Sequence, residues 1–321
     1  MLHPESKPMG RLRAGAKGRA AGWRRLGRVA LLGALLLVWP RAWAGGDPQE
    51  QLVRIPVTVK ALWGGTQTRD MPITLYRPQG PGPFPLLVLS HGRAGSSEQR
   101  AKPGIVRFES QARFFVRKGF MVLVPTRIGY GETGQGFDPE DSGTRKSRDY
   151  QWTLGAAATE ILAAAAYGRT LPGADGNRVV LVGQSVGGMA TVAAAAQNPP
   201  GVVAAINFAG GSGGDPDRHP GVPTDGGQLK RIFEALGKTA RVPMLWVYTE
   251  NDRYFAPEYS QAWAKAFGAS GGQVEYRLLP PFRDNGHELF AKGSDIWMPL
   301  VDAYLDRIGF TAPGLEPRPE P

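Results

Sequence analysis

Residues 178–196 read RVVLVGQSVGGMATVAAAA, and this stretch decides the fold. Residues 178–182 form a short apolar run, as in a strand buried on both faces, and residues 187–197 carry the small side chains of a packed helix. The pentapeptide GQSVG between them is a G-x-S-x-G motif, which forms a sharp turn when it joins a strand to a helix. This context predicts that Ser185 stands at the tip of the turn as a nucleophile. A Gly-rich tight turn with a surface serine remains the alternative.

The same alternation of strands and helices extends in both directions from this motif. Residues 52–60 and 71–76 alternate apolar and polar side chains, as half-buried antiparallel strands do. Short, mostly apolar runs predict further strands at 85–90, 120–125, 178–182, 202–208 and 242–249, and a sixth strand is predicted at 274–279. Helical patterns lie at 105–118, 148–167, 187–197, 228–236, 258–267 and 296–308. This order predicts an α/β fold with a mostly parallel sheet of about eight strands and helices on both faces.

A serine nucleophile needs a base, and chain order suggests which histidine supplies it. In folds that carry this motif, the acid and then the histidine follow the serine along the chain. Of the three histidines after residue 44, His287 follows the last predicted strand and is the expected base. His219 lies in a Gly- and Pro-rich loop and is interpreted as a solvated loop residue, while His91 precedes Ser185.

The acid is expected in the loop that follows the predicted strand 242–249. Asp252 is the preferred candidate, because the acid usually lies beyond the immediate end of the strand. Glu250 and Asp284 remain alternatives. An aspartate in such a loop can also serve only to form a turn.

Two backbone N–H groups are expected to stabilise an oxyanion at this site. Val186 follows the nucleophile and supplies one, and the loop after strand 85–90 supplies the other, with Arg93 as the expected donor. Gly92 would let the backbone approach the substrate, and His91 would brace the loop at the edge of the site rather than act as a base. A turn that is merely rich in Gly and Ser is the alternative.

Arg127 and Tyr130 follow the predicted strand 120–125, so both are candidate substrate-binding residues at the edge of the pocket. The loop that contains them is rich in glycine, and an ordinary surface loop is the alternative.

Four short motifs together resemble the dienelactone-hydrolase-like branch of the α/β-hydrolases. They are SHG at 90–92, GQSVGG at 183–188, NDR at 251–253 and GHELF at 286–290, and the resemblance covers about residues 52–308. It implies an α/β-hydrolase fold and acyl-transfer chemistry. Dienelactone hydrolases proper use a cysteine nucleophile, whereas this chain contains no cysteine and has Ser185. A serine carboxylesterase is therefore expected, with a peptidase-like amide hydrolase or a non-catalytic ligand-binding protein as alternatives.

The positive charge of the chain is concentrated near its amino terminus. Residues 1–44 contain nine Lys or Arg and a single Glu, so they carry +8 of the total +10. A basic stretch, the apolar run 29–39 and the small-x-small sequence Ala42-Trp43-Ala44 follow in the order of a bacterial signal peptide cleaved after Ala44. A short membrane anchor is the alternative, but the run is shorter than the about 20 residues that span a bilayer. Either Met1 or Met9 is the start.

The expected organisation is a signal peptide at 1–44, a hydrolase domain at 45–310 and a disordered Pro-rich tail at 311–321. The protein would be periplasmic or secreted, without stable membrane insertion after cleavage. The nearly balanced charge beyond residue 44 gives no footprint for nucleic acid. The sequence has no phosphate-binding or dinucleotide motif and no cluster of metal ligands, so neither a cofactor nor a metal is expected. The expected partner is a small-molecule ester substrate.

Overall fold

The computed structural model describes residues 49–63, 65–134, 136–144 and 146–311. The predicted signal peptide lies outside these residues, as does all but the first residue of the predicted tail.

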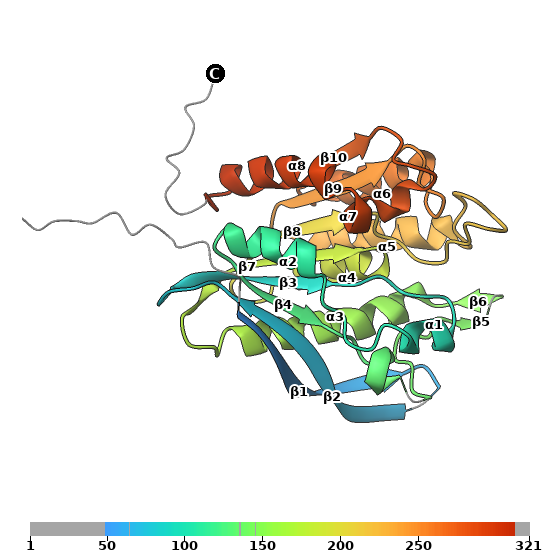
Figure 1. Cartoon of the computed structure of the whole chain (residues 1–321). Helices are drawn as coiled ribbons and strands as arrows, with labels where there is room; N and C mark the ends of the chain where they lie inside the picture. Colours follow the sequence, from blue (N-terminus) through green and yellow to red (C-terminus); the bar gives the residue numbers. More distant parts are fainter. Residues whose placement is uncertain (1–48, 64, 135, 145, 312–321) are drawn as a thin grey trace, which may run out of the picture. The chain divides into compact units, whose positions relative to one another are not determined.

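Eight strands form one sheet in the order β1-β2-β4-β3-β7-β8-β9-β10 (Figure 1). β2 pairs antiparallel with both β1 and β4, and every other neighbouring pair is parallel. The strands are β1 (Gln49–Ala61), β2 (Gly65–Arg77), β3 (Phe84–Ser90), β4 (Met121–Pro125), β7 (Ala174–Gln184), β8 (Val202–Phe208), β9 (Met244–Thr249) and β10 (Val274–Leu279). The prediction of an eight-stranded, mostly parallel sheet is confirmed.

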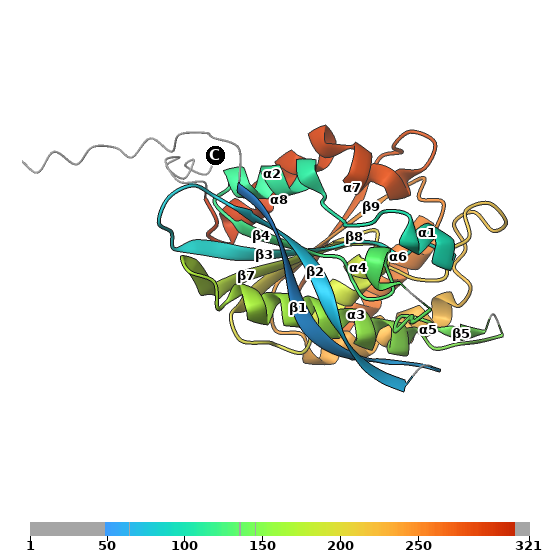
Figure 2. The ribbon, with the colours of Figure 1, turned by 60° about the horizontal axis from the view of Figure 1, so that its bottom comes forward.

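Helices cover both faces of the sheet because its central strands are apolar on both sides. Leu86 and Val88 of β3 belong to one buried cluster, whereas Leu87 and Leu89 belong to the other. The elements over the first face are α3 (Tyr150–Gly168), α4 (Val186–Ala195), α5 (Gly226–Thr239) and α6 (Pro257–Ala269). Those over the second face are α2 (Glu109–Arg117), α7 (Leu289–Lys292) and α8 (Ser294–Arg307). Figure 2 shows α2 and α8 on the side of the sheet opposite α3.

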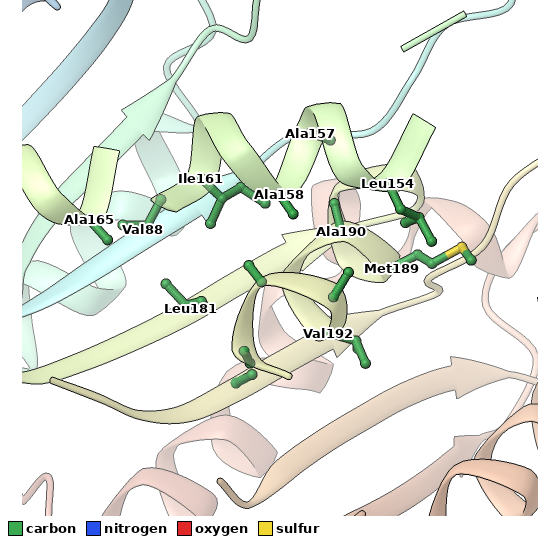
Figure 3. Close-up of a cluster of buried hydrophobic side chains, with 14 of the residues drawn as sticks. Val88, Leu154, Ala157, Ala158, Ile161, Ala165, Leu181, Met189, Ala190 and Val192 are labelled. Carbon is green, nitrogen blue, oxygen red and sulfur yellow. The ribbon is translucent and has the colours of Figure 1, made fainter. Parts of the chain in front are cut away.

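Small side chains let α3 and α4 approach the middle of the sheet closely. Ala157 and Ala158 of α3 lie near Ala190 of α4, and Val88 and Leu181 of the strands lie beneath them (Figure 3). All five side chains are buried. This packing fixes α4, and with it the turn that precedes α4, against the sheet.

An aromatic cluster on the other face joins the end of β8 to the segment that follows His287. The ring of Phe208 lies 4.6 Å from that of Phe290, and Phe290 stacks on Trp297 at 5.2 Å. All three side chains are buried. The last loop before α7 is therefore attached to a strand at the centre of the sheet.

The structure begins α2 four residues later than the predicted helix 105–118. Val106 is tied to the sheet instead, because its N–H donates to Thr126 Oγ1 at 2.8 Å and its carbonyl accepts from Thr74 Oγ1 at 3.0 Å. Phe108 then adopts a left-handed conformation with φ of 47°. The sequence pattern also missed several short elements: α1 (Ser97–Ala101), α7, η1 (Gly131–Thr133), η2 (Gly286–Glu288) and the hairpin of β5 (Gly143–Thr144) and β6 (Ser147–Arg148).

Candidate active site

Ser185 occupies a strained turn between β7 and α4. Its backbone angles are φ 58° and ψ −127°, a region that residues other than glycine rarely adopt and that costs on the order of 1–3 kcal/mol. The Ser185 N–H donates to the carbonyl of Phe208 at 2.9 Å, so the end of β8 holds the turn in place. The residue is half-buried and directly follows β7, at the carboxyl edge of the sheet.

The glycines on either side of Ser185 allow three segments to meet. A Cβ atom at Gly183 would lie 2.3 Å from the carbonyl oxygen of Gly187. A Cβ atom at Gly187 would lie 2.2 Å from the carbonyl oxygen of His91, in the loop after β3. The G-x-S-x-G spacing is thus the spacing at which strand, helix and neighbouring loop pack without collision.

His287 and Asp252 form a buried hydrogen-bonded pair. His287 Nδ1 lies 3.0 Å from Asp252 Oδ2. The other carboxylate oxygen, Oδ1, accepts the N–H groups of Tyr254 at 2.8 Å and Phe255 at 3.1 Å. A carboxylate only accepts hydrogen bonds, so in the neutral imidazole the ring proton lies on Nδ1 and the lone pair on Nε2.

Two amide side chains, which the sequence did not single out, hold His287 in place. Asn285 Oδ1 accepts the N–H groups of both His287 and Arg253, each at 3.1 Å. Gln184 Nε2 donates to the carbonyl of His287 at 2.9 Å. The residue beside the nucleophile is therefore bonded directly to the histidine loop, and Asn285 joins that loop to the loop containing Asp252.

Aromatic rings enclose the imidazole of His287. Tyr254 stacks on it with ring centroids 4.1 Å apart, and Phe255 approaches edge-on at 5.4 Å. Within the described residues, neither Ser185 Oγ nor His287 Nε2 forms a hydrogen bond. Catalytic hydrogen bonds are commonly long without substrate and shorten in the substrate complex.

Two backbone N–H groups near the nucleophile are candidates for an oxyanion hole. Val186 is the first residue of α4, where an N–H has no partner within the helix. The loop after β3 packs against the nucleophile, since a Cβ atom at Gly92 would lie 3.1 Å from Ser185 Cβ. Over the part of the chain that the structure describes, neither Val186 N–H nor Arg93 N–H donates to a protein acceptor. The Arg93 side chain instead pairs with Asp138, with the closer contact at 2.5 Å.

The structure places Arg127 and Tyr130 differently from the expectation that they line a substrate pocket. Arg127 is fully buried and Tyr130 is 3% exposed. The Tyr130 hydroxyl donates to Glu140 Oε2 at 2.9 Å, and Arg127 Nε donates to Glu140 Oε1 at 2.5 Å. Both side chains are therefore buried beside the loop after β3, where the carboxylate of Glu140 binds them.

Comparison with known proteins assigns the chain to a family. The model of the dienelactone hydrolase family matches residues 73–303. The chain belongs to the dienelactone hydrolase family. Its family is one of hydrolases within the α/β-hydrolase superfamily, as the sequence resemblance implied. No curated protein was found to match the chain.

Solved structures share the fold of this family member at low sequence identity. Acylaminoacyl peptidase from Pyrococcus horikoshii has a TM-score of 0.56 at 15% identity, over 86% of this chain and 43% of that one. A thermophilic esterase from Thermogutta terrifontis, solved with propionate bound, has a TM-score of 0.52 at 17% identity, over 86% and 99%. A 2,6-dihydroxy-pseudo-oxynicotine hydrolase has a TM-score of 0.53 at 15% identity, over 85% and 73%. These likenesses establish the fold alone, and the chain spans less than half of the peptidase.

The other candidates from the sequence lie outside the Asp252–His287 pair. Glu250 and Asp284 are exposed. His219 is exposed on the loop between β8 and α5, where it forms a β-bridge with Asp215.

The described residues of this hydrolase contain neither a candidate metal site nor a candidate membrane span. No group of three or more His, Asp or Glu among them is arranged to hold a metal ion. None of the described helices is both long and apolar enough to cross a membrane.

Proposed function

We propose that this dienelactone hydrolase family member is a serine hydrolase that cleaves a carboxylic ester. Ser185 is the nucleophile, His287 the general base and Asp252 the acid that orients it. The strained backbone of Ser185 carries the proposal, because strain of this size persists where the surrounding structure enforces it and is concentrated at functional sites. The buried Asp252–His287 pair supports it, since Gln184 bonds the histidine loop to the residue beside Ser185.

The proposed reaction divides ester cleavage into two steps. Ser185 Oγ attacks the ester carbon while His287 Nε2 takes the hydroxyl proton. The N–H groups of Val186 and Arg93 stabilise the negative oxygen that forms. His287 then gives the proton to the departing alcohol and leaves an acyl group on Ser185. A water molecule, deprotonated by His287, hydrolyses this acyl-enzyme and restores the serine.

An ester substrate is favoured over an amide by two comparisons. A dienelactone is a cyclic ester, so the family is described by an ester-cleaving activity. The similar esterase is covered almost completely by this chain, whereas the similar peptidase is not. The serine at position 185 separates the chain from hydrolases with a thiol nucleophile and makes the His287 base necessary, because a hydroxyl is a weak nucleophile without one.

The test uses the purified protein with para-nitrophenyl esters of rising acyl length and the matched para-nitroanilides. We expect ester turnover, covalent labelling of Ser185 by a fluorophosphonate, and loss of both in Ser185→Ala, with kcat reduced on the order of 10⁴-fold or more. Circular dichroism serves as the control for folding. Near-normal turnover by a folded Ser185→Ala variant would refute a serine nucleophile, and preference for the anilides would replace the ester with an amide.

A further inference from the structure

Arg127 is bonded to the inner side of the loop that follows β3, and all three of its guanidinium nitrogens are occupied. Nε donates to Glu140 Oε1 at 2.5 Å. Nη1 donates to the carbonyl of His91 at 2.5 Å and to Ser90 Oγ at 2.7 Å. Nη2 donates to the carbonyl of Gly92 and to Glu140 Oε2, each at 3.4 Å. One buried side chain thus binds two consecutive carbonyl groups of this loop.

The ring of His91 completes this arrangement. The backbone N–H of Arg127 donates to His91 Nε2 at 3.1 Å, so the ring proton lies on Nδ1. Nδ1 then donates to the carbonyl of Gly92 at 2.7 Å. Burial, and next the positive charge of Arg127, hold the pKa of His91 well below its usual range. His91 is therefore neutral at pH 7 and keeps this pattern of one donor and one acceptor.

These bonds determine the direction of the peptide between Gly92 and Arg93. In a trans peptide the carbonyl and the N–H point in opposite directions. With the Gly92 carbonyl bonded to Arg127 and His91, the Arg93 N–H points away from them. A reversal of this peptide would turn the Gly92 oxygen outward and remove the Arg93 donor. The loop lies so close to Ser185 that this reversal would place an oxygen where negative charge develops in the reaction.

The charge of Arg127 is balanced inside the protein. Both Arg127 and Glu140 are fully buried, and the Tyr130 hydroxyl also donates to Glu140 at 2.9 Å. Burial acts to raise the pKa of Glu140, but the charge of Arg127 and its hydrogen bond outweigh burial and lower the pKa. Glu140 is therefore ionised at pH 7 and keeps Arg127 in place under the loop.

We propose that Arg127 is a positioning residue that sets the direction of the Gly92–Arg93 peptide and so assembles the oxyanion hole. The catalytic part of this inference rests on the proposed function. Arg127 would act through the backbone and would not contact the substrate.

Arg127→Lys and Arg127→Met test the catalytic part. Lysine keeps the charge but lacks the planar fork that reaches two carbonyls and a carboxylate together. We expect kcat to fall about 10²–10³-fold in Arg127→Met, as for loss of one oxyanion donor, with a smaller fall in Arg127→Lys and little change in KM. The affinity for a trifluoromethyl ketone, whose adduct with serine carries an oxyanion, should fall in parallel with kcat.

Lys118→Met is the matched control. Lys118 is another buried cation, paired with Asp302 at 2.7 Å and Asp306 at 2.9 Å. It lies between α2 and the start of β4, whereas the candidate site lies at the carboxyl ends of the parallel strands. We expect this variant to lose stability while it keeps the wild-type kcat and inhibitor affinity. Equal losses of kcat in Lys118→Met and Arg127→Met would show that Arg127 affects kcat only through the stability of the fold, and would overturn the proposal.

Crystal structures of the wild type and of Arg127→Lys test the positioning role of Arg127 independently of the proposed function. Arg127→Lys is used because it is the variant expected to fold most readily. A reversed or rotated Gly92–Arg93 peptide in the variant supports the positioning role, even if the wild type proves not to cleave esters. An unchanged peptide together with wild-type kcat overturns it. Failure of a fluorophosphonate to label the wild type at Ser185 would refute the proposed function, and the peptide direction would still decide the inference.

Discussion

Asp252 uses its two carboxylate oxygens for different partners, and this division predicts the effect of an isosteric change. Oδ1 accepts two backbone N–H groups, and Oδ2 accepts the proton of His287 Nδ1. An asparagine would keep its carbonyl oxygen on the two N–H groups, so its NH₂ would face His287. The imidazole would then have to accept at Nδ1 and carry its proton on Nε2, where it has no lone pair for the serine proton.

We therefore predict that Asp252→Asn lowers kcat about 10³–10⁴-fold without unfolding the protein, by analogy with other triads. Glu250→Gln is the matched control, because Glu250 is exposed in the same loop, and it should retain most of kcat. Both variants are compared on one ester, with circular dichroism as the check on folding. A folded Asp252→Asn enzyme with near-normal kcat beside an inactive Glu250→Gln enzyme would move the acid role to Glu250.

Glu160 is a second buried acid near Arg127, and its charged form is disfavoured. It is fully buried; Oε2 accepts the Ile128 N–H at 2.6 Å, whereas Oε1 has no partner in the described structure. Burial, followed by repulsion from Glu140, raises its pKa well above the usual 4.5. The folded chain therefore keeps this proton to a higher pH than the unfolded chain, so this group makes folding less favourable as pH rises above 4.5.

Glu160→Gln should remove this decrease in the stability of the fold at higher pH, because glutamine keeps the acceptor for the Ile128 N–H and cannot ionise. We predict equal stability of variant and wild type near pH 4. Above that pH the variant should become the more stable, with a difference that grows by up to about 1.4 kcal/mol per pH unit until Glu160 ionises in the folded state. Urea unfolding at several pH values measures it. A difference that does not change between pH 4 and pH 8 would show that Glu160 is ionised normally in the folded protein.

At the scale of elements, the contact between α4 and the loop after β3 determines the geometry of the site. A Cβ atom at Gly187 would lie 2.2 Å from the His91 carbonyl oxygen and 2.6 Å from that of Ser90. Both atoms are backbone, so the loop itself would have to move to admit a methyl group.

Gly187→Ala should therefore destabilise the fold by about 1–3 kcal/mol, as overpacking does, and reduce kcat at least tenfold because the displaced loop carries an expected oxyanion donor. Gly155→Ala is the control: it lies in α3, where nothing stands within 4 Å of an added Cβ, and alanine should stabilise the helix by about 0.5–1 kcal/mol. Thermal unfolding and kcat are measured for both. Wild-type activity in Gly187→Ala would show that the loop tolerates the shift.

The major elements were predictable from sequence because the spacing of apolar side chains differs between strands and helices that pack against a core. The eight strands of the sheet lie at the apolar runs and at the alternating segments from which strands were predicted. The start of α2 was not predictable, because Val106 is bonded to hydroxyl groups on β2 and just beyond β4, which only the folded chain brings near. α7 is a single turn, too short to show a helical period.

At the scale of the whole molecule, the charged and apolar residues near the amino terminus indicate the compartment in which the protein acts. We propose that it is exported, because the basic, apolar and small-x-small segments of residues 1–44 follow the order of a signal peptide. We predict that the protein from its own host begins at Gly45 and is found in the periplasm or medium. Intact-mass spectrometry of the fractionated cells tests this, and an uncleaved chain in the membrane fraction would contradict it.

The sequence carried information on the candidate site through its motif and its chain order, but it carried none on which neighbouring side chains are buried. Ser185 was selected by its motif, Asp252 and His287 were selected by their order after particular strands, and the structure pairs Asp252 with His287. Arg127 was expected to bind substrate at the edge of the pocket because it follows the predicted strand 120–125. Its burial depends on Glu140, which lies in a different part of the loop and shows no motif that would pair it with Arg127.

The strained conformation of Ser185 makes the activity and the stability of the protein conflicting requirements. Glycine adopts positive φ without the steric penalty that serine bears, so the strain at this turn would be relieved by a residue that has no hydroxyl. A selection for heat resistance alone would therefore favour chains that have lost their nucleophile. Any directed-evolution programme on this hydrolase has to screen for turnover in every round, since its most stable descendants would include inactive ones.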